Sequence, residues 1–288
     1  MTLFEAIVIA VVEGITEFLP VSSTGHMIIA SSFLGIEESE FTKLFEVSIQ
    51  LGAILAVVLV YWRKFFQFTH WQFYAKLAVG VVPALLFGFL FNDAIDAMLS
   101  SQAIVAVSLL VGGIVLLFID KLFPQPAVPR PDLLAAETTP GELIEADNRL
   151  TYPKSFVIGL WQVLAMVPGV SRSAASIIGG MQQRLTRNFA AEFSFFLAVP
   201  TMAAATGYSV FLKKWDVDGG QQKGYELIMA SPDNMKAFLA GNVVAFIVAL
   251  VAIKFFISVL KRYGFRAFGI YRIVLGALLL ALIAAGKL

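Results

Sequence analysis

Two short polar segments interrupt apolar stretches of this sequence, and both carry residues suited to phosphate chemistry. The first begins with Glu13 and Glu17, which are four residues apart and therefore share one face of a helix. Two carboxylates inside an apolar segment are energetically expensive and mark a functional site. A shared proton or a divalent cation would lower that cost.

A cluster of hydroxyl side chains follows the acidic pair. Pro20 stops the incoming helix. The side chains of Ser22, Ser23 and Thr24 are suited to capping the outgoing helix, and His26 lies within reach on the same turn. A new helix N-terminus presents free N–H groups and a positive dipole end, which favour a phosphate group. The alternative is a solvated surface helix with an ordinary cap, which the apolar flanks disfavour.

The second polar segment carries a cation between two hydroxyl side chains. It runs from Pro168 to Ser173 and places Arg172 between Ser171 and Ser173. A guanidinium group binds two phosphate oxygens at once. The alternative is an Arg172 that reaches the lipid headgroups. Together the two segments supply carboxylates, hydroxyls, a histidine and an arginine, and this set favours phosphoryl transfer over ion conduction.

Four further polar residues are weaker candidates. Glu46 lies at the end of an apolar stretch, where it either lines the pocket or is a boundary charge. Lys254 and Arg272 lie near the ends of apolar stretches and are expected to reach the headgroups. His70 lies beside a tryptophan in a loop and is expected at the membrane interface.

Composition places the chain in a membrane. Of its 288 residues, 59% are hydrophobic and 14% charged, whereas soluble domains have about 45–50% and about 25%. The chain has no cysteine, which excludes disulfides and a thiol nucleophile, and its two histidines exclude a multi-histidine metal site. A net charge of +1 gives no basic surface for nucleic acid, so no nucleic-acid partner is expected.

Six stretches are long enough to cross a bilayer, which takes about 20 mostly apolar residues. Two others, Leu3–Leu34 and Ser155–Leu185, contain the polar segments near their middle, so each half is too short to cross. We expect both to be re-entrant helix hairpins that return to the side from which they enter. The expected spans are Phe45–Trp62, Tyr74–Phe91, Ala103–Ile119, Phe189–Leu212, Met235–Ile257 and Ala267–Ala285.

The loops predict the orientation. Those on one side, including Arg63–Ala75, carry twelve lysines and arginines against six on the other side, which also holds both termini. An excess of these residues marks the cytoplasmic face. The proline-rich segment 120–154 is therefore a cytoplasmic linker, and it joins repeat halves 1–119 and 155–288 within a single membrane domain.

The two halves resemble each other in the order of their elements. Pro20 and Pro168 are 148 residues apart, as are Ser23 and Ser171, and each half reads as a hairpin followed by three spans. Three crossings per half make the second half enter from the opposite side. We therefore expect an all-α polytopic membrane protein, with six transmembrane helices plus two re-entrant helix hairpins in an inverted-topology repeat. Such repeats place a site near the middle of the bilayer.

The two motifs resemble those of a known family. EGITEFLPVSSTGH at Glu13–His26 and PGVSRSAASI at Pro168–Ile177 are similar to segments of the undecaprenyl-diphosphate phosphatases of the bacitracin-resistance type. The resemblance covers essentially the whole chain, including FEVSIQLGAI at Phe45–Ile54, and the long linker is the main departure. It implies metal-dependent hydrolysis of undecaprenyl diphosphate to the monophosphate and inorganic phosphate. It also implies recycling of the lipid carrier for cell-wall glycan synthesis, bacitracin resistance and a divalent cation, Mg²⁺ or Ca²⁺.

The resemblance also implies a role for each matching residue. Glu13 and Glu17 would hold the metal. Either Ser23 or His26 would be the nucleophile, and the loss of Ser23 would weaken activity only partially if it merely binds phosphate. The implied catalytic residues are Ser23, His26, Glu17 and Arg172, and the implied substrate-binding residues are Ser22, Thr24, Gly25, Ser171, Ser173 and Glu46.

The expected partners are the polyprenyl diphosphate substrate and membrane lipids, and the sequence leaves a monomer and a homodimer open. The expected location is the bacterial plasma membrane, with a site that opens to the periplasmic or outer face. A lipid transporter is the rival from another class, because inverted repeats with broken helices are also typical of transporters. A metal-suited acidic pair beside hydroxyls and an arginine favours the enzyme, and a purely structural role leaves the buried charges unexplained.

Overall fold

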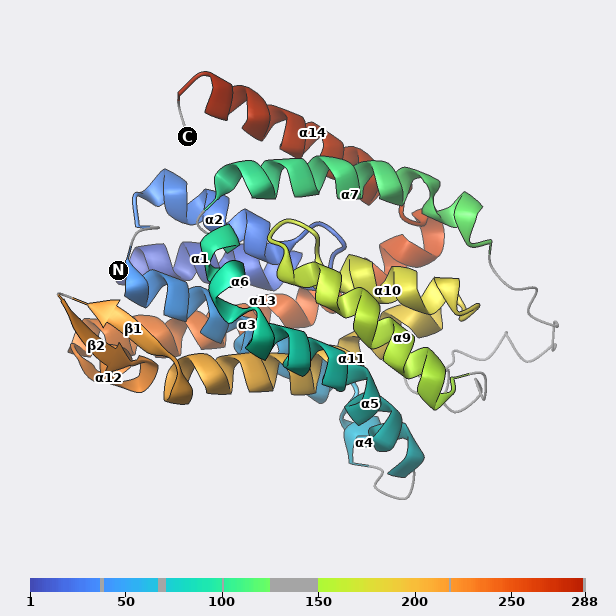
Figure 1. The fold of residues 1–288 in the computed structure, drawn as a ribbon, viewed down its shortest axis with the longest axis horizontal. Coiled ribbons are helices and arrows are strands. Elements are labelled where there is room, and N and C mark those ends of the chain that lie inside the picture. Colours follow the sequence, from blue (N-terminus) through green and yellow to red (C-terminus); the bar gives the residue numbers. More distant parts are fainter. Residues whose placement is uncertain (37–38, 67–70, 100, 125–149, 218, 287–288) are drawn as a thin grey trace.

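The computed structural model describes residues 1–36, 39–66, 71–99, 101–124, 150–217 and 219–286, and it is a layered bundle of helices (Figure 1). Among these residues, six helices are long and apolar enough to cross a membrane. They are α3 (Glu40–Val60), α5 (Trp71–Leu90), α7 (Gln102–Leu122), α11 (Arg187–Gly207) continued by the π-helical turn η3 (Tyr208–Leu212), α13 (Pro232–Tyr263) and α14 (Arg266–Ala284). The chain is therefore an integral membrane protein.

Each predicted span coincides with one of these helices, but several helices begin earlier than the apolar run. The cause is N-capping. The side chain of Ser231 accepts the N–H of Asn234 at 3.1 Å, and Pro232 follows at the first helical position. Polar caps therefore extend the helices beyond the residues that hydropathy identifies.

Two pairs of shorter helices contain the polar segments. The first helix pair is α1 (Leu3–Thr16) and α2 (Ser23–Leu34), which pack against each other. The second helix pair is α9 (Tyr152–Val163), extended by the 3-10 turn η2 (Leu164–Met166), and α10 (Arg172–Gln182). At 1.5 Å per residue, each of these helices is shorter than the roughly 30 Å hydrocarbon core of a bilayer.

The packing of the two halves is reciprocal. Helix α1 packs against α13 of the second half, and α9 packs against α5 of the first half. Likewise α3 packs against α13 and α11 against α5, while α7 packs against α14. Glycines bring the backbones together, because a Cβ on Gly14 would lie 2.7 Å from Val248 Cβ. Each of these helix contacts thus has a counterpart in the other half.

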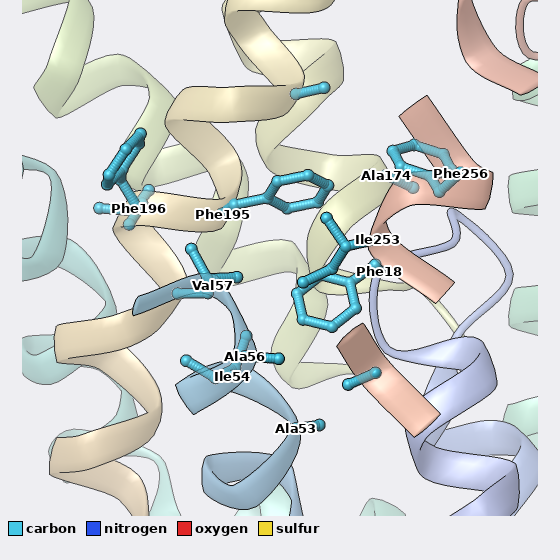
Figure 2. Close-up of a cluster of buried hydrophobic side chains, with 14 of the residues drawn as sticks. Phe18, Ala53, Ile54, Ala56, Val57, Ala174, Phe195, Phe196, Ile253 and Phe256 are labelled. Atoms are coloured by element: carbon cyan, nitrogen blue, oxygen red, sulfur yellow. The ribbon is translucent and has the colours of Figure 1, made fainter. Parts of the chain in front are cut away.

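A hydrophobic cluster fixes the first break between α1 and α2 (Figure 2). Phe18 follows Glu17 directly and is fully buried. Its ring meets Phe195 of α11 edge-on at a centroid distance of 5.2 Å, and Phe195 in turn contacts Phe256 of α13. Aromatic contacts of this geometry stabilise by about 0.5–1.5 kcal/mol each beyond burial. The break is therefore an anchored structure whose polar residues have defined positions.

The sequence did not predict the small elements in the loops. These are α4 (Trp62–Phe65), α6 (Asn92–Leu99), α12 (Gly224–Met229) and the antiparallel strands β1 (Lys214–Val217) and β2 (Gly220–Lys223). In the strand pair, Lys214 lies opposite Lys223 and Val217 opposite Gly220. The strand pair lies at the end of the bundle that also holds both chain termini (Figure 1). The all-α prediction is confirmed apart from these two short strands.

The predicted linker falls largely outside the described residues, as does His70. At the last described turn of α7, Asp120 pairs with Arg187 of α11 at 2.5 Å. The other oxygen of Asp120 accepts the backbone N–H of Phe265 at 3.3 Å. These bonds join the end of α7, the start of α11 and the turn before α14.

Candidate active site

The first break is the segment 17–22 between α1 and α2, and the second break is the segment 167–171 between η2 and α10. The two breaks meet in the core of the bundle, where charged residues from both helix pairs contact each other. Arg172, the first residue of α10, donates through Nη2 to Glu17 Oε1 at 2.5 Å. Ser23, the first residue of α2, donates through Oγ to the other oxygen, Glu17 Oε2, also at 2.5 Å. The Arg172 and Glu17 side chains are only 9% and 5% exposed. One carboxylate therefore bridges a hydroxyl of the first helix pair and the guanidinium of the second.

Arg172 is fixed by a hydrogen bond to α11, while its Nε–H donor has no partner among the described residues. Its Nη1 donates to the backbone carbonyl of Ser194 on α11 at 3.1 Å. Ser194 is itself fixed by a 2.6 Å contact with the hydroxyl of Ser176. The buried Nε–H of Arg172 has no hydrogen-bond partner among the described residues. Since a buried unpaired donor is costly, this N–H is poised for an anionic ligand.

The residue that caps each new helix has the same unusual backbone. Ser22 caps α2 with φ 73°, and Ser171 caps α10 with φ 74°. Positive φ costs a non-glycine residue about 1–3 kcal/mol and is typical of functional sites. These caps are one residue further apart than the two prolines, because the second break has one more residue between proline and cap. When the two caps are aligned, the residue that corresponds to Ser23 is therefore Arg172 and not Ser171.

A second arginine connects both breaks. Arg272 of α14 is fully buried. It donates to the carbonyls of Pro20 at 3.2 Å, Gly169 at 2.7 Å and Val170 at 3.0 Å. It also donates to two carbonyls of α7, those of Ser108 and Leu109. The prediction that Arg272 reaches the headgroups is therefore wrong, because backbone carbonyls solvate its charge inside the bundle. Lys254, by contrast, is exposed.

Both ring nitrogens of His26 are engaged away from Ser23. Nδ1 lies 2.6 Å from the carbonyl of Ser22, so Nδ1 carries the proton and donates it. Nε2 lies 2.7 Å from the hydroxyl of Tyr271 on α14 and therefore accepts from it in the neutral ring. The two rings are also nearly parallel, with centroids 5.7 Å apart. In this arrangement His26 has no free lone pair for attack on phosphorus.

The remaining acidic candidates lie close to this centre. Glu13 is fully buried, and neither of its oxygens has a hydrogen-bond partner among the described residues. Glu46 of α3 likewise has one buried oxygen, Oε1, without such a partner. A buried carboxylate in this state needs a proton or a cation. In the part of the chain that the structure describes, no group of three acidic or histidine side chains could by itself hold a metal ion.

A cavity of about 970 Å³ adjoins the joined residues. Its wall includes Glu17, Ser23 and Arg172 and extends to Asp96 of α6 and Lys213. Asp96 and Lys213 form an ion pair of 2.6 Å on the wall. The cavity is therefore large enough for a substantial ligand and leads from the buried charges toward the loops around α6 and β1.

The predicted site residues divide into two groups. Those that line the cavity are Glu17, Ser22, Ser23, Thr24, Glu46, Ser171 and Arg172. Those that are not among its lining residues are Glu13, Gly25, His26 and Ser173. The N–H of Gly25 already donates to Ser22 Oγ, and Ser173 donates to the carbonyl of Leu19. These contacts hold the breaks in shape.

Sequence reasoning missed three residues of the site. Ser194 was detectable, because it lies 148 residues after Glu46, which is the offset that the sequence predicts between its two halves. Tyr271 and Arg272 gave no such signal, because their importance arises from contacts with residues more than 100 positions away. Both come from α14, which thus supports each break.

The fold and site define a helical integral membrane protein with a buried serine–carboxylate–arginine centre. Residues 6–278 match the family described as bacitracin resistance protein BacA, so the chain belongs to that family. It is 53% identical to the undecaprenyl-diphosphatase of Flavobacterium johnsoniae over 97% of this chain and 96% of the relative. It is 49% identical to the protein of the same name from Porphyromonas gingivalis, over 99% and 98% of the two chains. The corresponding protein from Bdellovibrio bacteriovorus is 48% identical over the same shares.

Proposed function

We propose that this protein hydrolyses undecaprenyl diphosphate to undecaprenyl phosphate and inorganic phosphate, and so recycles the lipid carrier of cell-wall glycans and confers bacitracin resistance. The observation that carries the proposal is the carboxylate of Glu17, which bridges Ser23 and Arg172 on the wall of one cavity. This arrangement supplies a nucleophile, a base and a phosphate-binding cation within hydrogen-bond reach of one another.

Ser23 is the nucleophile in this mechanism. Its Oγ attacks the terminal phosphorus, and its proton passes to Glu17 Oε2, which already accepts it in a 2.5 Å hydrogen bond. The bond between that phosphorus and the bridging oxygen breaks, and undecaprenyl phosphate leaves with the electron pair of that bond and with the proton held by Glu17. Water then attacks the phosphorus of the phosphoserine, and Glu17, again a carboxylate, takes one proton of the water. The bond between phosphorus and Ser23 Oγ breaks, Oγ receives that proton from Glu17, and inorganic phosphate departs.

Arg172 positions the phosphate and controls the base. Its free Nε–H and its Nη2–H lie on one edge of the guanidinium plane, which matches two phosphate oxygens. When Nη2 turns from Glu17 to the phosphate, Glu17 Oε1 loses its hydrogen bond to the guanidinium, while Oε2 keeps that of Ser23. The arrival of substrate therefore places the guanidinium on the terminal phosphate and leaves Glu17 to accept the proton of Ser23.

A divalent cation fits beside these residues, and Glu13 and Glu17 would hold it. Glu13 is buried with two unpartnered oxygens, and Mg²⁺ is commonly bound by one or two carboxylates together with phosphate oxygens of the substrate. The cation, Mg²⁺ or Ca²⁺, would supply positive charge that offsets the diphosphate.

We also propose the topology that the sequence predicts. The reciprocal packing of α1 on α13 and of α9 on α5 supports an inverted repeat, and the short helices of both pairs support re-entrant hairpins. The cavity leads toward α6 and β1, which lie in the loops poorer in lysine and arginine. By the positive-inside rule the cavity opens to the periplasmic or outer face.

The experiment is phosphate release from undecaprenyl diphosphate by purified protein in detergent, with Mg²⁺, with Ca²⁺ and with a chelator. We expect cation-dependent release, and we expect Arg172→Ala to abolish it while Arg172→Lys retains a part. Arg266→Ala is the matched control, because Arg266 is exposed at the start of α14. Glu13→Gln should raise the cation concentration needed for half-maximal rate. Well-folded protein that releases no phosphate under any cation would refute the proposal.

A further inference from the structure

One wall of the cavity is apolar and has no role in the phosphate chemistry. It is formed by Leu85, Gly88 and Phe89 in the C-terminal half of α5 and by Met166 at the end of η2. The wall belongs to the same cavity as Ser23 and is therefore continuous with the phosphate site. Leu85 and Phe89 are 48% and 77% exposed, so the wall also reaches the outside of the bundle.

Helix α5 packs closely against α9 around Gly80 and Pro83. A Cβ on Gly80 would lie 3.0 Å from Ser155 Oγ, and a Cβ on Gly159 would lie 3.0 Å from Pro83 Cγ. The two backbones are therefore in direct contact at this level. Pro83 lies inside α5, where a proline removes one helical hydrogen bond and bends the helix.

Beyond Pro83 this close packing ends. Helix α9 stops at Val163, whereas α5 continues to Leu90 (Figure 1). A Cβ on Gly88 would meet only one atom outside its own helix within 4 Å, Met166 Cε at 3.5 Å. Methionine is unbranched and has three rotatable bonds, so it adapts its shape easily. A single adaptable side chain therefore separates the cavity from the side of the bundle here.

We infer that the prenyl chain of the substrate leaves the cavity sideways, through the gap between Gly88 and Met166, while its diphosphate stays at Arg172. The inference rests on the proposed function and names the path of the lipid. A long prenyl chain is insoluble in water and must stay in contact with hydrocarbon. The short second helix pair leaves this part of α5 uncovered, and Gly88 provides the room that any side chain would fill.

The test compares chain lengths. Gly88→Leu fills the gap from α5, and Met166→Trp fills it from the other side. Each is assayed with undecaprenyl diphosphate and with dimethylallyl diphosphate, whose chain is a single isoprene unit. We expect both variants to raise the KM for the long substrate at least tenfold with little change in kcat, and to leave kcat/KM for the short substrate within twofold. Gly207→Leu is the control, because Gly207 lies on α11 with nothing within 4 Å of its added Cβ and does not line the cavity.

Three results would overturn the inference. Equal losses for both substrates would mean that the variants damage the phosphate site. An unchanged KM for the long substrate in both variants would mean that the chain takes another path. A wild-type protein that hydrolyses neither of the two substrates would refute the proposed function itself. This outcome is determined on the unsubstituted protein alone.

Discussion

The buried Arg272 allows the sharpest test of how the site is held together. Arg272→Met keeps an unbranched side chain, two atoms shorter than that of arginine, and removes every donor. The carbonyls of Pro20, Gly169 and Val170 lie outside the helices, and Arg272 is the donor that the described residues provide for them. Each buried carbonyl left unpaired costs about 1–3 kcal/mol, which gives about 3–9 kcal/mol for the three.

The lost hydrogen bonds belong to the two turns that contain the positive-φ residues Ser22 and Ser171. Pro20 precedes Ser22 by two residues, and Val170 precedes Ser171 directly, so the carbonyls bound by Arg272 lie beside both positive-φ caps. The lower bound of about 3 kcal/mol corresponds to a loss of roughly a hundredfold in kcat/KM if the turns relax before the transition state is reached. We expect Arg272→Met to reach or exceed this loss, and Arg272→Lys, with a charge but fewer donors, to fall between it and the wild type.

The assay is phosphate release together with thermal unfolding in the same detergent. Lys254→Met is the matched control, because it removes an exposed cation from α13. An Arg272→Met protein with kcat/KM within threefold of the wild type would refute the reasoning. If this variant does not fold, the comparison of Arg272→Lys with the wild type carries the test.

Further predictions concern the surroundings of the same site. A Cβ on Gly112 would lie 2.7 Å from the Arg272 Cζ, so Gly112→Ala should displace the guanidinium and lower activity at least tenfold, whereas Gly207→Ala, with open space around its Cβ, should change it less than twofold. Ser171→Gly should unfold at a higher temperature than Ser171→Ala, because glycine accepts the φ of 74° and its loss of the cap costs only a few tenths of a kcal/mol against about 1 kcal/mol for alanine. Tyr271→Phe removes the hydrogen bond to His26 but keeps the stacked ring; its effect on activity should not add to that of His26→Ala, and full additivity in the double variant would contradict the coupling.

Local patterns in the sequence were sufficient to predict the elements. Apolar runs identified all six long helices, since a bilayer imposes length and hydropathy on each span separately. The breaks at Pro20 and Pro168 were equally local, because a proline followed by small polar residues ends one helix and caps the next. The strands β1 and β2 were missed, because they lie in a polar loop where no membrane constrains the pattern.

Contacts between residues far apart in the sequence determine the burial of Arg272 and the orientation of His26, which local sequence patterns did not predict. Arg272 near the end of an apolar run has the same local pattern as an arginine that reaches the headgroups. Only the carbonyls of α7 and of both breaks, together with the room left by Gly112, make its burial favourable. His26 posed the same difficulty. The family resemblance left His26 as a possible nucleophile, and Tyr271, on the other half of the chain, engages its Nε2.

The most direct test of the account is the comparison of Ser23→Ala with His26→Ala in phosphate release from undecaprenyl diphosphate. Removing a nucleophile that acts together with its base costs roughly 10⁴-fold or more in kcat, whereas removing a residue that positions a turn leaves measurable activity. The hydrogen bond from Ser23 to Glu17 and the engaged nitrogens of His26 predict that Ser23→Ala is inactive and His26→Ala is only weakened. An inactive His26→Ala beside a Ser23→Ala that retains a tenth of wild-type activity would contradict it.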